Sequence, residues 1–147
     1  MNFRTLNPSH LAYAAHRLIS LFLMALLSLQ TLAWAHSNEY LATVKGAHGG
    51  MLRMAEMYHF ELVVKNGEAR VWVTDHGDVP QSTKGAVGTL RFITGNGAFS
   101  VYLTPTGSNT LLTKDARIKS RKGTRMVLTV TMNGEQPLPT RFSMDEK

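Results

Sequence analysis

The chain has 147 residues, a formal net charge of +6 at pH 7 and no cysteine. The lack of cysteine excludes disulfide bonds, thiolate metal sites and cysteine nucleophiles, so a metal ion would be held by His, Met, Asp, Glu or backbone groups. The positive charge is mild and spread along the chain, with one cluster at Lys119, Arg121, Lys122 and Arg125. Because neither interleaved aromatic residues nor a nucleic-acid motif accompanies this cluster, we expect no nucleic-acid partner.

The N-terminal segment has the pattern of a secretion signal. Arginines precede an apolar run at residues 18–29, which is short for a membrane span, and Ala33-Trp34-Ala35 matches an A-x-A cleavage site. We expect a signal peptide at residues 1–35, export to the periplasm and no stable membrane insertion after cleavage. An uncleaved anchor is the alternative, because the segment before the apolar run is long. Residues 36–147 are enough for one domain.

Alternating apolar and polar residues predict a β-hairpin at residues 57–75. Asn66-Gly67 separates the two strands and favours a type I′ turn. This turn sets a register in which Glu61 faces Trp72 and His59 faces Thr74. One face of the hairpin is then apolar and belongs to the core. That face consists of Tyr58, Phe60, Leu62, Val64, Ala69, Val71 and Val73.

The rest of the chain continues with short strands and turn residues. A second hairpin is predicted around Gly95-Asn96-Gly97, and Asn133-Gly134 marks another turn. No segment after residue 35 has a helical period over several turns. We therefore predict an all-β fold, an antiparallel immunoglobulin-like β-sandwich of seven or eight short strands, with a small barrel as the second choice. Beyond the first hairpin, strands are predicted at 90–94, 99–103, 110–113, 117–119, 125–132 and 140–143.

The polar face of the first hairpin concentrates donor atoms that transition metals bind. The register places Met57 opposite His76, with His59 and Glu61 further along the same face, and the Gly-rich segment at His48 precedes this strand. Thioether sulfur favours Cu(I), and imidazole suits Cu, Zn, Ni and Co. We therefore predict a transition-metal site at these five residues, with copper favoured and Zn, Co or Ni as alternatives.

The same residues also have ordinary structural explanations. His59 and Glu61 alternate with core residues, so they are expected on a solvent-facing surface whether or not they bind metal. Met51, Met54 and Met57 can equally fill gaps in an irregular core.

The predicted cleavage site suggests a second way to bind metal. If processing leaves His36 as the first residue, its α-amine and imidazole can chelate Cu(II). A second histidine, His48, His59 or His76, would complete a histidine brace. An alanine inserted before His36 would test this, because it removes the terminal chelate.

Several motifs together resemble a group of small periplasmic metal-binding proteins from bacteria. These motifs are His48-Gly49-Gly50, the Glu61-Leu62-Val63 stretch and the strand ending at His76. The same HGG and ELV pattern is similar to the start of some adaptor subunits of heavy-metal efflux pumps of the resistance-nodulation-division class. The resemblance implies periplasmic metal handling by His48, His59, Glu61 and His76, and an efflux system as partner. The chain departs from those adaptors because it has no helical hairpin or lipoyl-like region.

These features together predict a periplasmic heavy-metal-binding protein that captures and releases a transition metal in resistance or homeostasis. The alternative is a noncatalytic interaction or adaptor module without a stoichiometric metal. The sequence has no nucleophile elbow, no H-E-x-x-H motif and no phosphate-binding loop, so we do not expect an enzyme.

Overall fold

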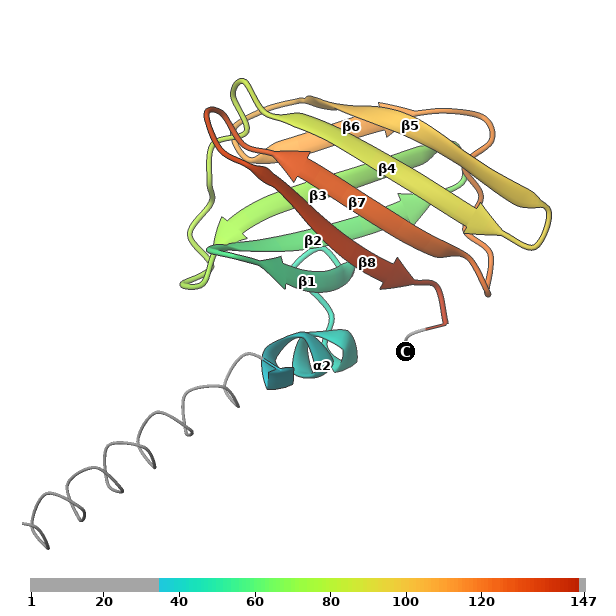
Figure 1. The fold of residues 1–147 in the computed structure, drawn as a ribbon, viewed down its shortest axis with the longest axis horizontal. Coiled ribbons are helices and arrows are strands. Elements are labelled where there is room, and N and C mark those ends of the chain that lie inside the picture. The colour runs from blue at the N-terminus through green and yellow to red at the C-terminus, as the bar shows by residue number, and fades with distance from the viewer. Residues whose placement is uncertain (1–34, 146–147) are drawn as a thin grey trace, which may run out of the picture. The chain divides into compact units, whose positions relative to one another are not determined.

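Eight antiparallel strands and one short helix make up residues 35–145, the part of the chain that this computed structural model describes (Figure 1). The predicted all-β antiparallel class is confirmed. The predicted signal segment lies outside the described residues except for Ala35. The elements are α2 (Ala35–Thr43), β1 (Met51–Ala55), β2 (Tyr58–Lys65), β3 (Glu68–Asp75), β4 (Val87–Thr94), β5 (Gly97–Pro105), β6 (Thr110–Lys114), β7 (Arg125–Thr131) and β8 (Pro137–Ser143).

The strands form one hydrogen-bonded sheet that curls back on itself. Their order in the sheet is β1-β2-β3-β6-β5-β4-β7-β8. β5 pairs with β4 along its length and with β6 only at Thr104 and Pro105, so the sheet changes layer there. The two outer strands, β1 and β8, come into contact (Figure 1). The result is a two-layered, nearly closed sheet that combines features of the predicted sandwich and of a small barrel.

The first hairpin has the predicted register and core face. Glu61 pairs with Trp72 and His59 with Thr74. Its apolar face lines the interior between the layers, because side chains alternate in direction along each strand. The fully buried residues contributed by this hairpin are Phe60, Leu62, Ala69, Val71 and Val73.

The turn of this hairpin differs from the predicted type I′. That type requires positive φ at both central residues, whereas Gly67 has a φ of 83° and Asn66 is not among the described residues with positive φ. A neighbouring loop explains the difference. Gly67 donates its N–H to Ile118 O and accepts from Asp115 N–H, and Asn66 Oδ1 accepts from Ser120 N–H. Contacts from distant residues therefore hold this turn.

Three local predictions were wrong or incomplete. Residues 117–119 form a turn region instead of a strand, and Ile118 from it is fully buried.

Helix α2 and strand β1 were not predicted. β1 alternates toward the core at Met51, Arg53 and Ala55, which pair with core residues of β2. A charged Arg53 at the central core-facing position breaks the apolar–polar alternation by which a strand is recognised in the sequence. Its side chain is 8% exposed and its guanidinium lies 5.5 Å from the ring centre of Phe142.

Candidate functional site

The Gly-rich segment before β1 forms a tight loop that closes over the carboxylate of Glu61. Gly46 N–H donates to Gly50 O, and Gly49 N–H donates back to Gly46 O. Glu61 projects from β2 into this loop and is only 6% exposed. Its Oε1 accepts the N–H groups of His48 and Gly50, both at 2.8 Å. Its Oε2 lies 2.7 Å from Nδ1 of His48. The carboxylate is thus fully occupied by the loop.

Glycine is required at two positions of this loop because Glu61 fills the space beside them. A Cβ on Gly46 would lie 2.2 Å from Cδ of Glu61, and a Cβ on Gly50 would lie 2.7 Å from its Cγ. Gly49 has open space around it but a φ of +77°, which other residues adopt at a cost. The His48-Gly49-Gly50 motif is therefore explained first by the structure of the loop.

His48 lies flat against Trp72 on the outer face of the sheet. The two ring centres are 3.9 Å apart and the ring planes differ by 7°. Trp72 is the cross-strand neighbour of Glu61, so the loop, the carboxylate and the indole form one packed cluster. Arg70 adds its guanidinium at 5.6 Å from the Trp72 ring. A histidine held through Nδ1 by a carboxylate keeps Nε2 for another partner, which is an arrangement common in metal ligands.

A second histidine arrangement lies at the other end of the same hairpin. His59 and His76 stack with ring centres 5.1 Å apart and an angle of 17° between planes. Nδ1 of His59 lies 3.6 Å from Oδ1 of Asp78. Nε2 of His76 lies 2.9 Å from the carbonyl oxygen of Glu56. The His59 side chain is 17% exposed, whereas that of Asp78 is 87% exposed.

The turn that carries His76 and Asp78 is fixed by Asp75 at the end of β3. Its Oδ1 accepts the N–H groups of Gly77 at 2.8 Å and Val79 at 3.0 Å. The bond from Val79 is the main reason that the pKa of Asp75 is lowered, with smaller contributions from Gly77, Gln81 and the charge of His76. This turn gives Asp78 a positive φ of 60°. Local hydrogen bonds therefore position two of the three polar side chains of this group.

The three methionines of this segment, of which Met57 was the predicted ligand, are separated by the fold. Met51 packs against the core, and Met54 lies on the opposite face of β1. Met57 is 64% exposed in the β1–β2 turn. That turn also contains Glu56, whose carbonyl oxygen contacts His76. Met57 therefore lies in the turn next to the histidine pair, but not in a strand paired with His76, because the β2–β3 pairing ends at Tyr58 and Asp75. The brace proposed for His36 is not tested, because its side chain lies outside the described part of the structure.

The structure thus divides the predicted ligands into two groups. His48 and Glu61 belong to the Trp72 cluster, and His59 and His76 form a pair with Asp78. Within the described residues, no set of three or more His, Asp or Glu side chains is already arranged around one point as a metal site. The sequence analysis did not include Asp78 among the candidate ligands. The feature that could have indicated it is its position two residues after His76 in a turn that contains glycine.

Comparison with protein-family models, curated proteins and solved structures gave no match to this chain. Among residues 35–145, no helix combines the length and the apolar character that crossing a membrane requires.

Proposed function

We propose that this protein is a periplasmic heavy-metal-binding protein that captures and releases a transition-metal ion at His59 and His76. The observation that supports this most is the contact between the two imidazole rings on an accessible edge of the hairpin. Asp78 is the nearest carboxylate to His59 within the described ion pairs and adds an oxygen donor. The resemblance to efflux-pump adaptors supports metal resistance or homeostasis as the setting, with an efflux system as the partner.

The spacing of the histidine pair is compatible with sharing one ion once the stacked rings rotate so that one nitrogen of each faces the ion. Metal–nitrogen bonds are about 2.0–2.1 Å, so two imidazole nitrogens on one ion lie within about 4.2 Å of each other. The ring centres are already 5.1 Å apart. Rotation breaks one hydrogen bond, from His76 to the carbonyl oxygen of Glu56. A site that needs such rearrangement suits reversible capture better than permanent storage.

Donor chemistry favours copper at this site. Two imidazoles and a carboxylate accept most late divalent metals, and among those Cu(II) binds most tightly. The exposed thioether of Met57 in the adjacent turn would add a soft donor that favours Cu(I). Zn, Co and Ni are the alternatives. In this proposal neither Glu61 nor His48 is a ligand, because the Glu61 oxygens already accept three contacts from the loop and His48 is held against Trp72.

Metal titration of the purified protein tests the proposal. We expect one equivalent of Cu(II) to bind more tightly than an isolated surface histidine would hold it, with weaker binding of Zn, Co and Ni. The double variant His59→Ala with His76→Ala should lose this binding while circular dichroism shows an unchanged β-sheet. His48→Ala is the matched control, because His48 belongs to the Trp72 cluster, and it should bind copper like the wild type.

Two results would reject this site. Copper binding that persists in the double variant would mean that the ligands lie elsewhere, and the His36 brace would then be tested with an inserted alanine. Wild-type protein that binds no metal stoichiometrically would favour the alternative, a noncatalytic interaction module. An observation that favours this alternative is the exposure of large apolar side chains on the sheet, led by Tyr102 at 78%.

A further inference from the structure

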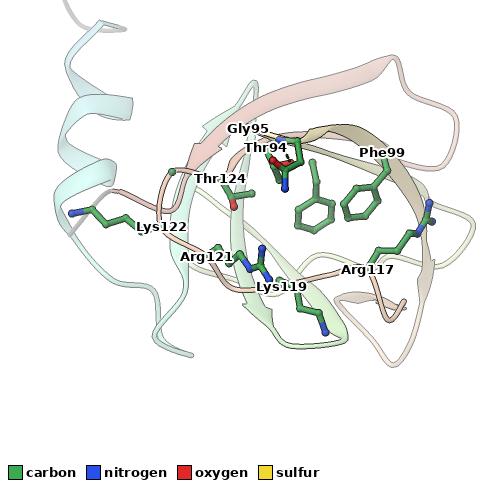
Figure 2. Close-up of a pocket in the computed structure, with 11 residues that line it drawn as sticks. Thr94, Gly95, Phe99, Arg117, Lys119, Arg121, Lys122 and Thr124 are labelled. Carbon is green, nitrogen blue, oxygen red and sulfur yellow. Dashed lines mark hydrogen bonds between the residues drawn. The ribbon is translucent and has the colours of Figure 1, made fainter.

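A separate pocket of about 330 Å³ opens beside the hairpin of β4 and β5. Its walls come from that hairpin and from the loop between β6 and β7, two segments that are distant in the sequence (Figure 2). The hairpin contributes Phe92, Phe99 and the polar turn around Asn96. The loop contributes a run of basic residues. None of the histidines discussed above lines it.

Positive charge dominates one wall of this pocket. Lys119, Arg121 and Lys122 line it together with Arg117, and within residues 35–145 no acidic side chain is part of the lining. Figure 2 shows Arg121 directed into the hollow, whereas Lys122 extends away from it. Arg117 is partly neutralised, since its guanidinium donates to both oxygens of Asp115, from Nε to Oδ1 and from Nη2 to Oδ2. Arg121 is therefore the cation best placed for an anionic group, and Lys119 lines the same wall.

The opposite wall is aromatic, which the sequence did not reveal. Phe92 and Phe99 stack with ring centres 4.9 Å apart and an angle of 11°. The guanidinium of Arg117 lies 4.7 Å from the centre of the Phe99 ring. Phe99 forms the accessible part of this apolar wall, and Phe92, which is 1% exposed and anchored in the core, supports it from inside. A pocket with positive charge on one side and phenyl rings on the other is suited to a ligand that has an anionic group at one end and an apolar group at the other.

The basic loop is held in place before any ligand arrives. Ser120 N–H donates to Asn66, and Gly123 N–H donates to Oδ1 of Asp145 at 2.9 Å. Met144 N–H donates to the carbonyl oxygen of Thr124. A preorganised loop loses less conformational entropy on binding. These hydrogen bonds therefore fix the basic loop as part of the pocket wall.

We propose that this pocket binds a small organic anion in which an apolar ring carries a phosphate or carboxylate group. The anionic group pairs with Arg121, beside Lys119 on the same wall, and the ring packs against Phe99, which stacks on the buried Phe92. Arginine is suited to such groups because its planar fork forms two parallel hydrogen bonds. The volume is near the lower end of small-molecule pockets, about 300–1,000 Å³, which fits one ring with one charged group.

Phenyl phosphate is a suitable probe because it combines the two ends. In a titration followed by amide NMR, it should shift Gly95, Asn96 and Gly123 in a saturable manner. Inorganic phosphate and phenol at the same concentrations should each bind more weakly than phenyl phosphate. Phosphate contacts only the basic wall, and phenol contacts only the aromatic wall. Arg121→Gln should raise the Kd for phenyl phosphate by about tenfold, as expected for loss of about 1.4 kcal/mol from a charged hydrogen-bonded pair.

Arg141→Gln is the matched control, since it removes the same charge from an exposed position on β8 outside the pocket lining. It should leave the Kd unchanged. The proposal is overturned if phenyl phosphate does not bind saturably, if the shifts map to another surface, or if both arginine variants weaken binding equally. Because no copper ligand is involved, this result is independent of the metal titration.

Discussion

At the scale of single residues, Glu61 links the sequence motif to the structure. Its position on the polar face of the hairpin predicted a solvent-facing carboxylate, but the loop at residues 46–50 buries it. A buried carboxylate is costly unless its oxygens are satisfied. Here the N–H groups of His48 and Gly50 satisfy one oxygen, and the His48 ring contacts the other. The strand, the loop and the histidine therefore depend on one another.

The two neighbouring glycines of this loop allow a direct test of that dependence. Gly50→Ala should destabilise the protein by about 2–3 kcal/mol, because its Cβ would crowd Glu61 and the carbonyl oxygen of Leu62, at 2.8 Å from the latter. Gly49→Ala should cost only about 1 kcal/mol, the penalty for a left-handed backbone without a clash. Urea denaturation measures both. Equal losses would show that Glu61 does not set the shape of the loop.

At the scale of elements, the loop after β6 shows how distant contacts override local patterns. Ile118 N–H donates to the carbonyl oxygen of Asp115, which closes a turn, and the Ile118 side chain enters the core. Arg117 folds back onto the Asp115 carboxylate at 2.6 Å. This contact lowers the pKa of Asp115 to about 2 through hydrogen bonds from the Arg117 side chain and backbone. A backbone hydrogen bond and an ion pair therefore both hold this turn closed.

The lowered pKa of Asp115 predicts a defined dependence of stability on pH. Its folded pKa of about 2 is below its usual value of 3.8, so the ionised form favours the folded state. The stabilisation is fully present above pH 3.8 and is lost as the pH falls through about 2. Asp115→Asn should therefore be less stable than the wild type at pH 6, and the difference should shrink as the pH approaches 2 and vanish below it. Denaturant midpoints across this range measure it, and a constant difference would contradict the assignment.

The elements that could be predicted from sequence are those defined by neighbouring residues. The β2–β3 register follows from a two-residue turn and regular alternation, and it also predicted that His59 and His76 lie on one face. β1 could not be predicted because Arg53 occupies a core-facing position. The burial of Glu61 and the approach of Asp78 to His59 depend on loop closure. The basic and aromatic walls of the pocket meet only when the two layers assemble.

At the scale of the whole molecule, one side-chain contact joins distant parts of the curled sheet. Tyr58 at the start of β2 donates its hydroxyl to Oε1 of Glu135 at 2.6 Å, and Glu135 lies in the turn between β7 and β8. β1 and β8 are the outer strands of the sheet order and lie side by side in Figure 1. The contact therefore helps to hold the two edges of the sheet together where hydrogen-bonded pairing ends.

Removing this hydroxyl should weaken the closure of the sheet. Tyr58→Phe should lower the free energy of unfolding by up to about 1 kcal/mol at pH 7, the usual contribution of one hydrogen bond. The bond to Glu135 also raises the pKa of Tyr58 above 10.0, so its protonated form favours folding. The stabilisation is present below pH 10 and is lost as the pH rises through the raised value. Tyr102→Phe is the control because Tyr102 is 78% exposed. It should leave the free energy of unfolding unchanged. If both variants unfold alike at pH 7, the Tyr58 contact does not contribute to closing the sheet.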